Sequence, residues 1–263
     1  MAWIGVGYRP QLRSWIKTNP VELECLEVTA EHFFGGEQEI LEELRQRYPI
    51  FVHGLGLSIG TPGPLDQDLL NSFVDVVDVV NPEWVSEHIA FTRSSEVDLG
   101  HLNPVIPSKK VLEWVVSHSR EIADRCQKPV ILENITTNLK LKGDYSETDF
   151  MNRICDEADC GLLLDVTNLY INSRNHGFDP ERWLAELDPS RIIQLHVVGY
   201  EERSGRLVDT HRNDIQDDLM SLIQCVLRQS SVRAVTIERD ANFSGFGFLG
   251  KELRKLKDLM LVQ

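Results

Sequence analysis

The sequence predicts an α/β protein folded as a (β/α)8 TIM barrel, in which eight parallel strands alternate with helices. Short runs rich in Val, Ile and Leu are typical of strands buried on both faces of a parallel sheet, and they alternate with amphipathic stretches of helical period. The length of 263 residues suits such a barrel, and no long linker or low-complexity tract interrupts the pattern. We therefore expect residues 1–263 to form a single domain.

The predicted strands are continuous apolar, β-branched runs, and the predicted helices carry apolar residues three and four apart. The eight strands are Ile4–Gly7, Glu24–Val28, Ile50–Leu55, Trp84–His88, Pro129–Asn134, Gly161–Val166, Ile192–Val198 and Arg233–Glu238. The helices between them are Glu37–Tyr48, Asp66–Val80, Lys109–Lys128, Glu147–Asp159, Pro180–Leu187 and Asp214–Gln229. The fifth helix follows Asp179, a capping residue, and begins with Pro180, which favours the first helical position.

An open doubly wound sheet is the alternative architecture, and it calls for a glycine-rich turn after an early strand. Residues 54–60 read GLGLSIG, which does not follow the GxGxxG spacing of dinucleotide-binding turns. We interpret this segment as a loop after a barrel strand, where the backbone passes close to a ligand. A plain flexible loop is nearly as good an interpretation.

Composition excludes several classes of function. The formal net charge of −14 argues against nucleic-acid binding, which requires clustered Lys and Arg. No apolar run approaches the roughly 20 residues of a membrane span, and the first residues lack the pattern of a signal peptide. The five cysteines are irregularly spaced and are interpreted as buried thiols in a reducing compartment. We expect a cytoplasmic protein that binds neither nucleic acid nor membrane.

Six predicted strands end in a residue that can ligate a metal ion. These residues are His53, His88, Glu133, Asp165, His196 and Glu238. Because the active site of a barrel lies at the carboxyl ends of its strands, we expect the six side chains to converge on one cavity. A buried carboxylate or imidazole is costly unless it is paired or coordinates a metal. The pattern therefore predicts a metal centre; a hydrogen-bonded polar core without metal is the less favoured alternative.

Two polar segments carry further candidates. Asp209 and His211 lie two residues apart in LVDTHRND, so in an extended segment both side chains point the same way, although a solvated loop is an equal alternative. The segment 165–179 is polar for a strand end, and its Asn168, Asn175 and His176 line the pocket, bind metal or shape a turn.

The eight His, Asp and Glu candidates exceed what one ion can use, because an octahedral ion takes about six donors. Two or three ions, with a carboxylate such as Glu133 as bridge, account for the excess. Thiolate ligands are absent from the set, which disfavours a structural zinc site and favours a partly open catalytic cluster. We expect Glu133 and Asp165 to act in catalysis.

Together these motifs resemble a known family. The succession VHGLGLSIG, SEHIAF, ILEN, LLLDVTNLYINSRNHGFDP, LHVVGY, DTH and IERD is similar to that of the multinuclear non-heme iron-dependent oxidative enzymes. That family was long known as domain of unknown function 692 or UPF0276, and it includes the methanobactin-biosynthesis iron oxidase. The resemblance runs from about Gly5 to Asp240.

The resemblance implies a xylose-isomerase-like TIM barrel that holds two or three iron ions of mixed Fe2+/Fe3+ state. His53, His88 and Glu133 match one iron site; Glu133, Asp165, His196 and Glu238 match the second; Asp209 and His211, with Asn168, match a weaker third. Family members use O2 to modify a residue, most often cysteine, of a ribosomally made peptide during natural product biosynthesis. A small partner protein often presents the precursor peptide.

Four departures from the family pattern leave substrate and product open. Thr167 stands in place of a second Asn, Arg212 in place of Gly and His32 in place of Asn, and residues 135–137 replace a Pro-Ser run. The ligand types are unchanged at all of the matched positions.

The alternative function is a divalent-metal sugar isomerase or phosphodiester hydrolase on the same barrel. An isomerase calls for a lysine near the metal pair, but Lys109, Lys140 and Lys142 are not at strand ends. A nuclease calls for a basic surface, against the charge of −14.

Overall fold

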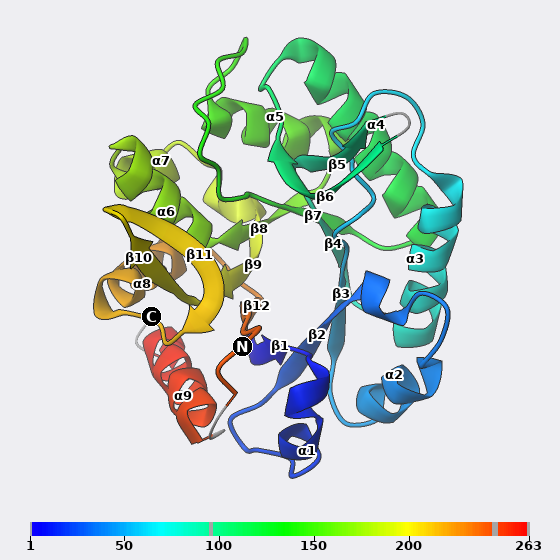
Figure 1. The fold of residues 1–263 in the computed structure, drawn as a ribbon, viewed down its shortest axis with the longest axis vertical. Coiled ribbons are helices and arrows are strands. Elements are labelled where there is room, and N and C mark those ends of the chain that lie inside the picture. Colours follow the sequence, from blue (N-terminus) through cyan, green and yellow to red (C-terminus); the bar gives the residue numbers. More distant parts are fainter. Residues whose placement is uncertain (1, 95–96, 244–246, 262–263) are drawn as a thin grey trace.

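The computed structural model describes residues 2–94, 97–243 and 247–261, and these form a closed parallel barrel surrounded by helices (Figure 1). The barrel strands are β1 (Trp3–Gly7), β2 (Cys25–Thr29), β3 (Ile50–His53), β4 (Val85–His88), β7 (Val130–Glu133), β8 (Gly161–Asp165), β9 (Ile192–Val197) and β12 (Ala234–Ile237). Their order around the barrel is β1-β12-β9-β8-β7-β4-β3-β2. The predicted fold class and the eight predicted strands are confirmed.

The predicted helices are also present, with somewhat shorter ends. They are α2 (Gln38–Arg45), α3 (Gln67–Val80), α4 (Lys109–Cys126), α5 (Glu147–Ala158), α7 (Pro180–Leu184) and α8 (Asp217–Gln229). Several begin where a side chain caps the free N–H groups of the first turn. Asp66 accepts hydrogen bonds from the backbone N–H of Asp68 and Leu69, and Asp179 does the same for Glu181 and Arg182.

Three further helices were not predicted from the sequence: α1 (Arg13–Ile16), α6 (Val166–His176) and α9 (Gly247–Leu261). Helix α6 begins directly after β8, in the segment that we interpreted as a polar pocket or turn. Residues Val166–Ser173 are all buried, including the polar residues Thr167, Asn168, Asn172 and Ser173, so the helix shows no alternation of apolar and polar faces. The helix has no hydrophobic period because its polar side chains are buried in the protein interior together with its apolar ones.

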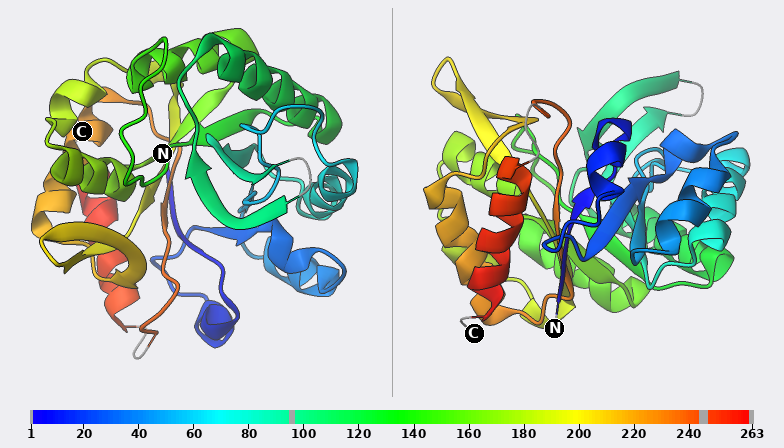
Figure 2. Two further views of the ribbon diagram at one scale, coloured as in Figure 1. Left: turned by 45° about the horizontal axis from the view of Figure 1, so that its top comes forward. Right: turned by 90° about the horizontal axis from the view of Figure 1, so that it is seen from below.

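Two hairpins rise from the carboxyl end of the barrel (Figure 2). The first joins β5 (Ala90–Ser94) to β6 (Val97–Pro104), and the second joins β10 (Gly199–Arg203) to β11 (Arg206–Asn213). The segment that contains Asp209 and His211 is therefore a strand rather than a loop. It lies beside α6, so the second hairpin is packed against the barrel wall.

The barrel interior is layered because every second residue of a strand points inward. A cluster of apolar side chains closes the amino end: Cys25, Phe51, Trp84, Ile131, Leu163 and Ala234. Two residues further along the same strands stand polar residues, among them Glu27, Ser86 and Thr236. The alternation therefore places the ligand-type residues at the carboxyl end, above an apolar plug.

Two glycines of the segment 54–60 lie where there is no room for a side chain. A Cβ at Gly54 would lie 2.6 Å from a Glu87 oxygen, and one at Gly60 would lie 2.8 Å from the Ala90 carbonyl oxygen. The N–H groups of Leu55 and Gly56 donate to Glu31. The carboxylates of Glu31 and Glu87 fix this loop, and the two glycines permit the close approach.

No helix in the described part of the chain is long and apolar enough to cross a membrane.

We expect the substitution Trp84→Ala to destabilise the fold by about 3–5 kcal/mol, because it leaves a cavity in the apolar cluster at the amino end of the barrel. The Trp84 ring stacks on Phe51 with centroids 4.4 Å apart, and its Nε1 donates to Gln194 at 2.7 Å. Denaturant unfolding followed by circular dichroism measures the loss. Val21→Ala, at a position 85% exposed, is the control and should change stability little. Equal stability of the two variants would show that the plug does not hold the barrel.

Candidate metal centre

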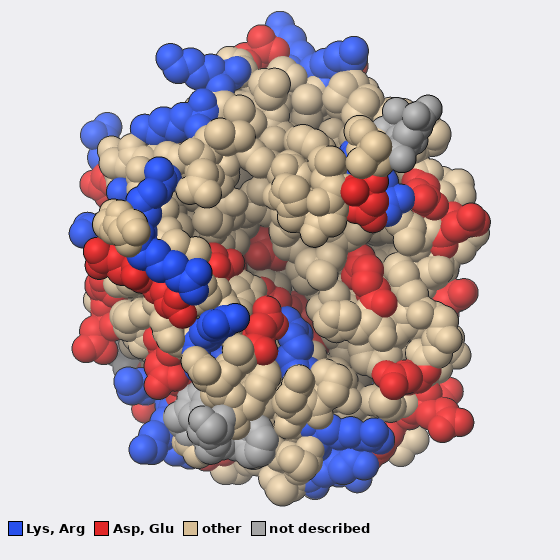
Figure 3. Space-filling view, in the orientation of Figure 1, with Lys and Arg blue, Asp and Glu red and all other residues tan. Residues whose placement is uncertain are grey.

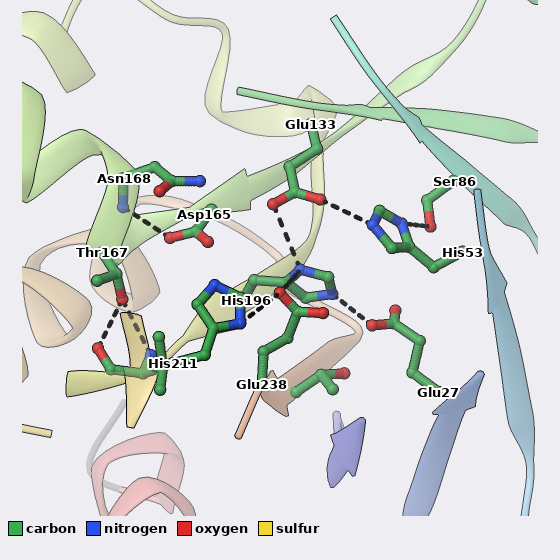
Figure 4. A network of polar contacts seen from close by, with 12 residues as sticks. Glu27, His53, Ser86, Glu133, Asp165, Thr167, Asn168, His196, His211 and Glu238 are labelled. Atoms are coloured by element: carbon green, nitrogen blue, oxygen red, sulfur yellow. Dashed lines mark hydrogen bonds and ion pairs between the residues drawn. The ribbon is translucent and has the colours of Figure 1, made fainter. Parts of the chain in front are cut away.

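The six strand-end residues converge, as the sequence predicted, at the carboxyl end of the barrel. Figure 4 shows His53, Glu133, Asp165, His196 and Glu238 of this set. Their ligand atoms form three overlapping groups, and within each group all atoms lie within 4.8 Å of one another. The groups are His53, His88 and Glu133; Glu133, Asp165, His196 and Glu238; and His53, His196 and Glu238. All six residues are buried, so their charges face one another with little solvent between them.

Glu133 is the residue that links the two sides of the cluster. Its Oε2 lies 3.3 Å from His53 Nε2 and 3.2 Å from His88 Nε2. Its Oε1 lies 3.4 Å from His196 Nδ1, which in turn lies 3.3 Å from Glu238 Oε2. One carboxylate thus faces imidazoles of two different groups, the position expected of a bridging ligand.

The hydrogen bonding of these atoms is incomplete in a way that fits a metal ion. Glu133 Oε2 and His196 Nδ1 are buried and have no hydrogen-bond partner, although each lies close to other ligand-type atoms. Buried polar atoms are nearly always satisfied, and exceptions mark functional sites or missing ions. The set of imidazole nitrogens and carboxylate oxygens, without thiolate, suits iron, manganese or zinc.

Each of the three imidazoles is anchored through the nitrogen that faces away from the cluster. Figure 4 shows these contacts for His53 and His196. His53 Nδ1 lies 2.8 Å from the Ser86 hydroxyl, and His88 Nδ1 lies 3.1 Å from the carbonyl oxygen of Gly54. His196 Nε2 lies 2.6 Å from Glu27 Oε1. Metal-bound histidines in proteins are held in this manner, because the second nitrogen fixes the tautomer and the ring orientation.

The anchoring carboxylate, Glu27, was not among the predicted site residues. It belongs to β2, and its other oxygen accepts a hydrogen bond from Gln194, which also accepts from Trp84. A carboxylate within the apolar run CLEVT was the available signal, since alternation places residue 27 on the same face as Cys25 and Thr29. Glu27 was not predicted because the ligands predicted on barrel strands were all residues at the ends of those strands, and Glu27 lies within one.

Burial and mutual repulsion set the protonation of the metal-free cluster. Burial lowers the pKa of His53 well below its usual range, and the neighbouring imidazoles add to the effect. Burial also opposes the charge on His88, but Glu133 and Glu87 outweigh it and raise the pKa of His88 to about 9. The pKa of Asp165 is raised by burial and by the charge of Glu133. The cluster without metal therefore retains protons that a cation must displace.

Asp165 serves both the cluster and the fold. It ends β8 and caps α6, accepting a hydrogen bond from the backbone N–H of Asn168 at 2.7 Å. The cap fixes the carboxylate at the junction of strand and helix, where it joins Glu133, His196 and Glu238.

Asp209 and His211 reach the same cavity from β11, and His211 Nδ1 lies 3.8 Å from Glu238 Oε2 of the cluster. His211 Nε2 lies 2.9 Å from Asp209 Oδ2, and His211 Nδ1 lies 3.3 Å from Asp240 Oδ2. Arg9 occupies the neighbouring position, with its Nε 2.6 Å from Asp240. These residues line the cavity above the cluster. Their predicted part in a third ion site stays a prediction.

The amide of Asn168 is engaged on both sides. Its Nδ2 donates to the carbonyl oxygen of Asn134 at 3.1 Å, and its oxygen accepts from the Thr136 hydroxyl. Asn168 therefore secures the segment after β7, and its predicted role as a ligand is untested.

The cluster lies at the base of a cavity of about 400 Å³ that opens at the carboxyl end of the barrel. Acidic side chains are visible deep in this hollow in the space-filling view (Figure 3). Leu55, Leu102 and Ile135 form apolar parts of the wall, and Arg9 is the one lysine or arginine among the described lining residues. The size suits a side chain or a short stretch of a larger substrate.

We expect the substitution Glu27→Gln to weaken metal binding about 10- to 100-fold, because His196 loses its charged anchor. Isothermal titration of the metal-free protein with Mn2+ or Fe2+ measures the loss. Glu43→Gln removes a surface carboxylate paired with Arg13 and Lys17, and it should bind as the wild type does. Unchanged affinity in a folded Glu27→Gln protein would contradict the anchoring role.

Metal affinity should rise with pH, because ligation requires neutral His88 and its pKa is about 9 in the metal-free protein. The dissociation constant should fall about tenfold per pH unit between about pH 7 and pH 9 for each proton displaced. Titration in buffers of different ionisation enthalpy counts the released protons. Binding that is independent of pH, with no proton release, would be the contrary result.

Comparison with solved structures agrees with this fold. Endonuclease IV from Thermus thermophilus aligns with a TM-score of 0.63 at 14% identity, covering 99% of this chain and all 100% of that one. The IOLI protein with a binding zinc atom gives 0.60 at 12%, covering 99% and 97%. A xylose isomerase domain protein from Planctomyces limnophilus gives 0.58 at 14%, covering 100% and 97%. These identities show the fold alone, a xylose-isomerase-like barrel.

Comparison of sequences identifies the family. UPF0276 proteins of Acaryochloris marina and Chromobacterium violaceum are each 32% identical, over 254 and 260 residues. The alignments cover 95% and 97% of this chain and 92% and 94% of those proteins. The model of the family described as RiPP precursor modification enzyme MbnB/TglH/ChrH matches residues 3–261, where RiPP denotes a ribosomally synthesised, modified peptide. The chain therefore belongs to the MbnB/TglH/ChrH family of RiPP precursor modification enzymes.

Proposed function

We propose that this chain is a multinuclear non-heme iron enzyme that uses O2 to oxidise a cysteine of a ribosomally made peptide. The observation that carries the proposal is the position of Glu133, whose two oxygens face imidazoles of two overlapping ligand groups. A carboxylate in that position fits a pair of ions better than a single one. Membership of a family that modifies RiPP precursors supports a peptide as substrate.

The first two proposed ligand sets follow the geometry of the cluster, and the third follows the family resemblance. His53, His88 and Glu133 would hold one ion, Glu133, Asp165, His196 and Glu238 a second, and Asp209, His211 and Asn168 a weaker third. Bound iron, in a mixed Fe2+/Fe3+ state, would supply one-electron chemistry and open positions for O2 and a thiolate.

The chain itself contributes orientation and protection from water. Ser86, Gly54 and Glu27 fix the three imidazoles from behind, so little reorganisation accompanies ion binding. We assign the catalytic roles to Glu133, which sets the spacing of the two sites, and to Asp165, which faces the cavity. Burial holds the pKa of Asp165 above its usual range until a cation displaces the proton.

Substrate choice should reside in residues that line the cavity and differ from the family pattern. His32 and Thr136 both line it. By contrast, the Thr167 hydroxyl donates to the carbonyl oxygen of Val198 at 2.8 Å and anchors α6. Two of the four departures noted in the sequence therefore bear on the substrate, and Thr167 bears on the fold.

We further propose that a small partner protein presents the precursor peptide and that the reaction takes place in the cytoplasm. The five cysteines are free thiols, and four of them are buried, which suits a reducing compartment.

The hydrolase and isomerase alternatives have less support in the cavity. Among the described residues that line it, Arg9 is basic but no lysine is present. Lys140, the best placed of the three candidate lysines, donates to the carbonyl oxygen of His176 at 2.6 Å, outside the cluster.

We expect protein purified without oxygen to contain about two or three iron ions per chain. His53→Ala and Asp165→Ala should lose iron, because each removes a ligand from a different group. Mass spectrometry of metals and Mössbauer spectroscopy provide the measurement. His101→Ala changes an exposed histidine and should keep the full complement.

Iron-loaded protein should then change the mass of a cysteine-bearing precursor peptide only when O2 is present. Zinc or manganese alone, with no iron taken up on reconstitution, would reject the oxidative function in favour of a hydrolase or isomerase.

A further inference from the structure

A second cavity, of about 490 Å³, adjoins the cluster cavity and has no part in holding metal. Its lining residues come from the segment that follows β7, from helix α5 and from the end of α6. Its walls are mainly apolar and include Val105, Met151, Tyr145, Phe150, Phe178 and Trp183. A preformed apolar pocket with few polar groups is the usual form of a ligand site.

The two cavities share one wall, residues 134–137, which we term the partition. Thr136 lines the cluster cavity, Asn134 and Thr137 line the second cavity, and Ile135 lines both. The partition begins directly after Glu133, the bridging residue. A single stretch of backbone therefore separates the cluster from the apolar pocket.

Helix α6 holds the partition rigidly through three residues spaced four apart. Asn168 and Asn172 donate to backbone carbonyl oxygens of the partition at 3.1 and 2.9 Å. Asn172 also accepts from the N–H of Thr137, and His176 Nε2 lies 2.7 Å from the carbonyl oxygen of Thr137. Residues four apart share one helix face, so one face of α6 fixes the whole wall.

The aromatic walls of the second cavity are also fixed in place. Tyr145 and Phe150 stack with centroids 6.4 Å apart and planes 29° apart. The Trp183 indole N–H donates to Glu147 at 3.0 Å, which sets the ring orientation. Offset and edge contacts with further rings are available to an aromatic side chain that enters.

The mouth of this cavity carries exposed apolar side chains. Leu139, on its lining, is 57% exposed, and Ile106, between two lining residues, is 49% exposed. Exposed apolar side chains at the edge of a pocket are typical of binding sites.

We propose that the second cavity binds an aromatic side chain of the peptide substrate, a near neighbour in sequence of the residue that enters the cluster cavity. The proposal rests on the proposed function in so far as the substrate is a peptide. An extended peptide advances about 3.3 Å per residue and turns successive side chains to opposite sides. A peptide laid across the partition therefore presents side chains to both cavities at a fixed spacing.

The charges at the rim favour an aromatic occupant over a charged one. Lys140 and Lys142 line the cavity together with Glu147 and Glu186, so its lining has no net excess of either sign. The Thr148 hydroxyl donates to Glu186 at 2.6 Å, which occupies one of its oxygens. The deeper wall consists of aromatic rings and aliphatic groups. An apolar side chain therefore gains the most binding free energy there, because burial of apolar area is favourable.

The probes are synthetic peptides that each carry one cysteine and, at successive distances from it, Phe, Ala or Lys. Displacement of a fluorescently labelled Phe peptide from the full chain, free of metal, gives the affinities. At one preferred spacing the Phe peptide should bind about tenfold or more tightly than its Ala counterpart. Equal binding of the Phe and Ala peptides, or tightest binding of the Lys peptide, would overturn the proposal.

The substitution Leu141→Trp should fill the mouth of the pocket and abolish the advantage of Phe, because Leu141 lines the cavity and is only half-buried. Val21→Trp, at an exposed position that does not line the cavity, should keep the advantage. An advantage that persists in Leu141→Trp would place the aromatic side chain elsewhere. If that variant does not fold, the wild-type comparison decides alone.

The metal content of the same proteins separates the two proposals. Loss of the Phe advantage in Leu141→Trp with full iron content supports the pocket. Protein that takes up no iron but still prefers Phe would reject the oxidative function and leave the pocket in place.

Discussion

The structure is organised around the electrostatic cost of gathering three carboxylates and three imidazoles at one buried point. Glu133, Asp165 and Glu238 lie within one group of ligand atoms, where solvent screens them little. Like charges at such distances repel strongly in a medium of low dielectric constant. Protons and the histidines relieve part of this repulsion, as the raised pKa of Asp165 and the lowered pKa of Glu238, due to His196, both show. Glu133 Oε2 and His196 Nδ1 have no hydrogen-bond partner, and a bound cation would balance the carboxylate charge that remains.

The rest of the barrel serves to hold this arrangement. Alternation along the strands puts apolar rings at the amino end, anchoring groups such as Glu27 and Ser86 in the middle, and ligands at the carboxyl end. Trp84 joins the first layer to the second through Gln194, and Gln194 joins Glu27, which anchors His196. Packing at the closed end of the barrel is thereby connected to the orientation of a ligand at the open end.

The barrel and its six converging residues could be predicted because both depend on the same sequence pattern. Continuous apolar runs identify buried parallel strands, and a charged residue such as Asp165 at the end of such a run is conspicuous. A polar residue inside an apolar run, such as Glu27, was not predicted as part of the site. A helix without a hydrophobic period, such as α6 with its buried Asn168 and Asn172, was not predicted either. The hairpin that carries Asp209 and His211 was also missed, since β11 is only partly buried and does not alternate. Tertiary packing, rather than local pattern, determines these elements.

The two overlapping ligand groups differ in their formal charge. One comprises two imidazoles and a single carboxylate, whereas the other comprises one imidazole and three carboxylates, with Glu133 common to both. The imidazole of the more anionic group, His196, is itself backed by the carboxylate of Glu27 rather than by a hydroxyl or a carbonyl. The cluster is thus polarised along the line that passes through Glu133. Two cations of the same element placed there experience unequal fields, and the more anionic half favours the higher positive charge.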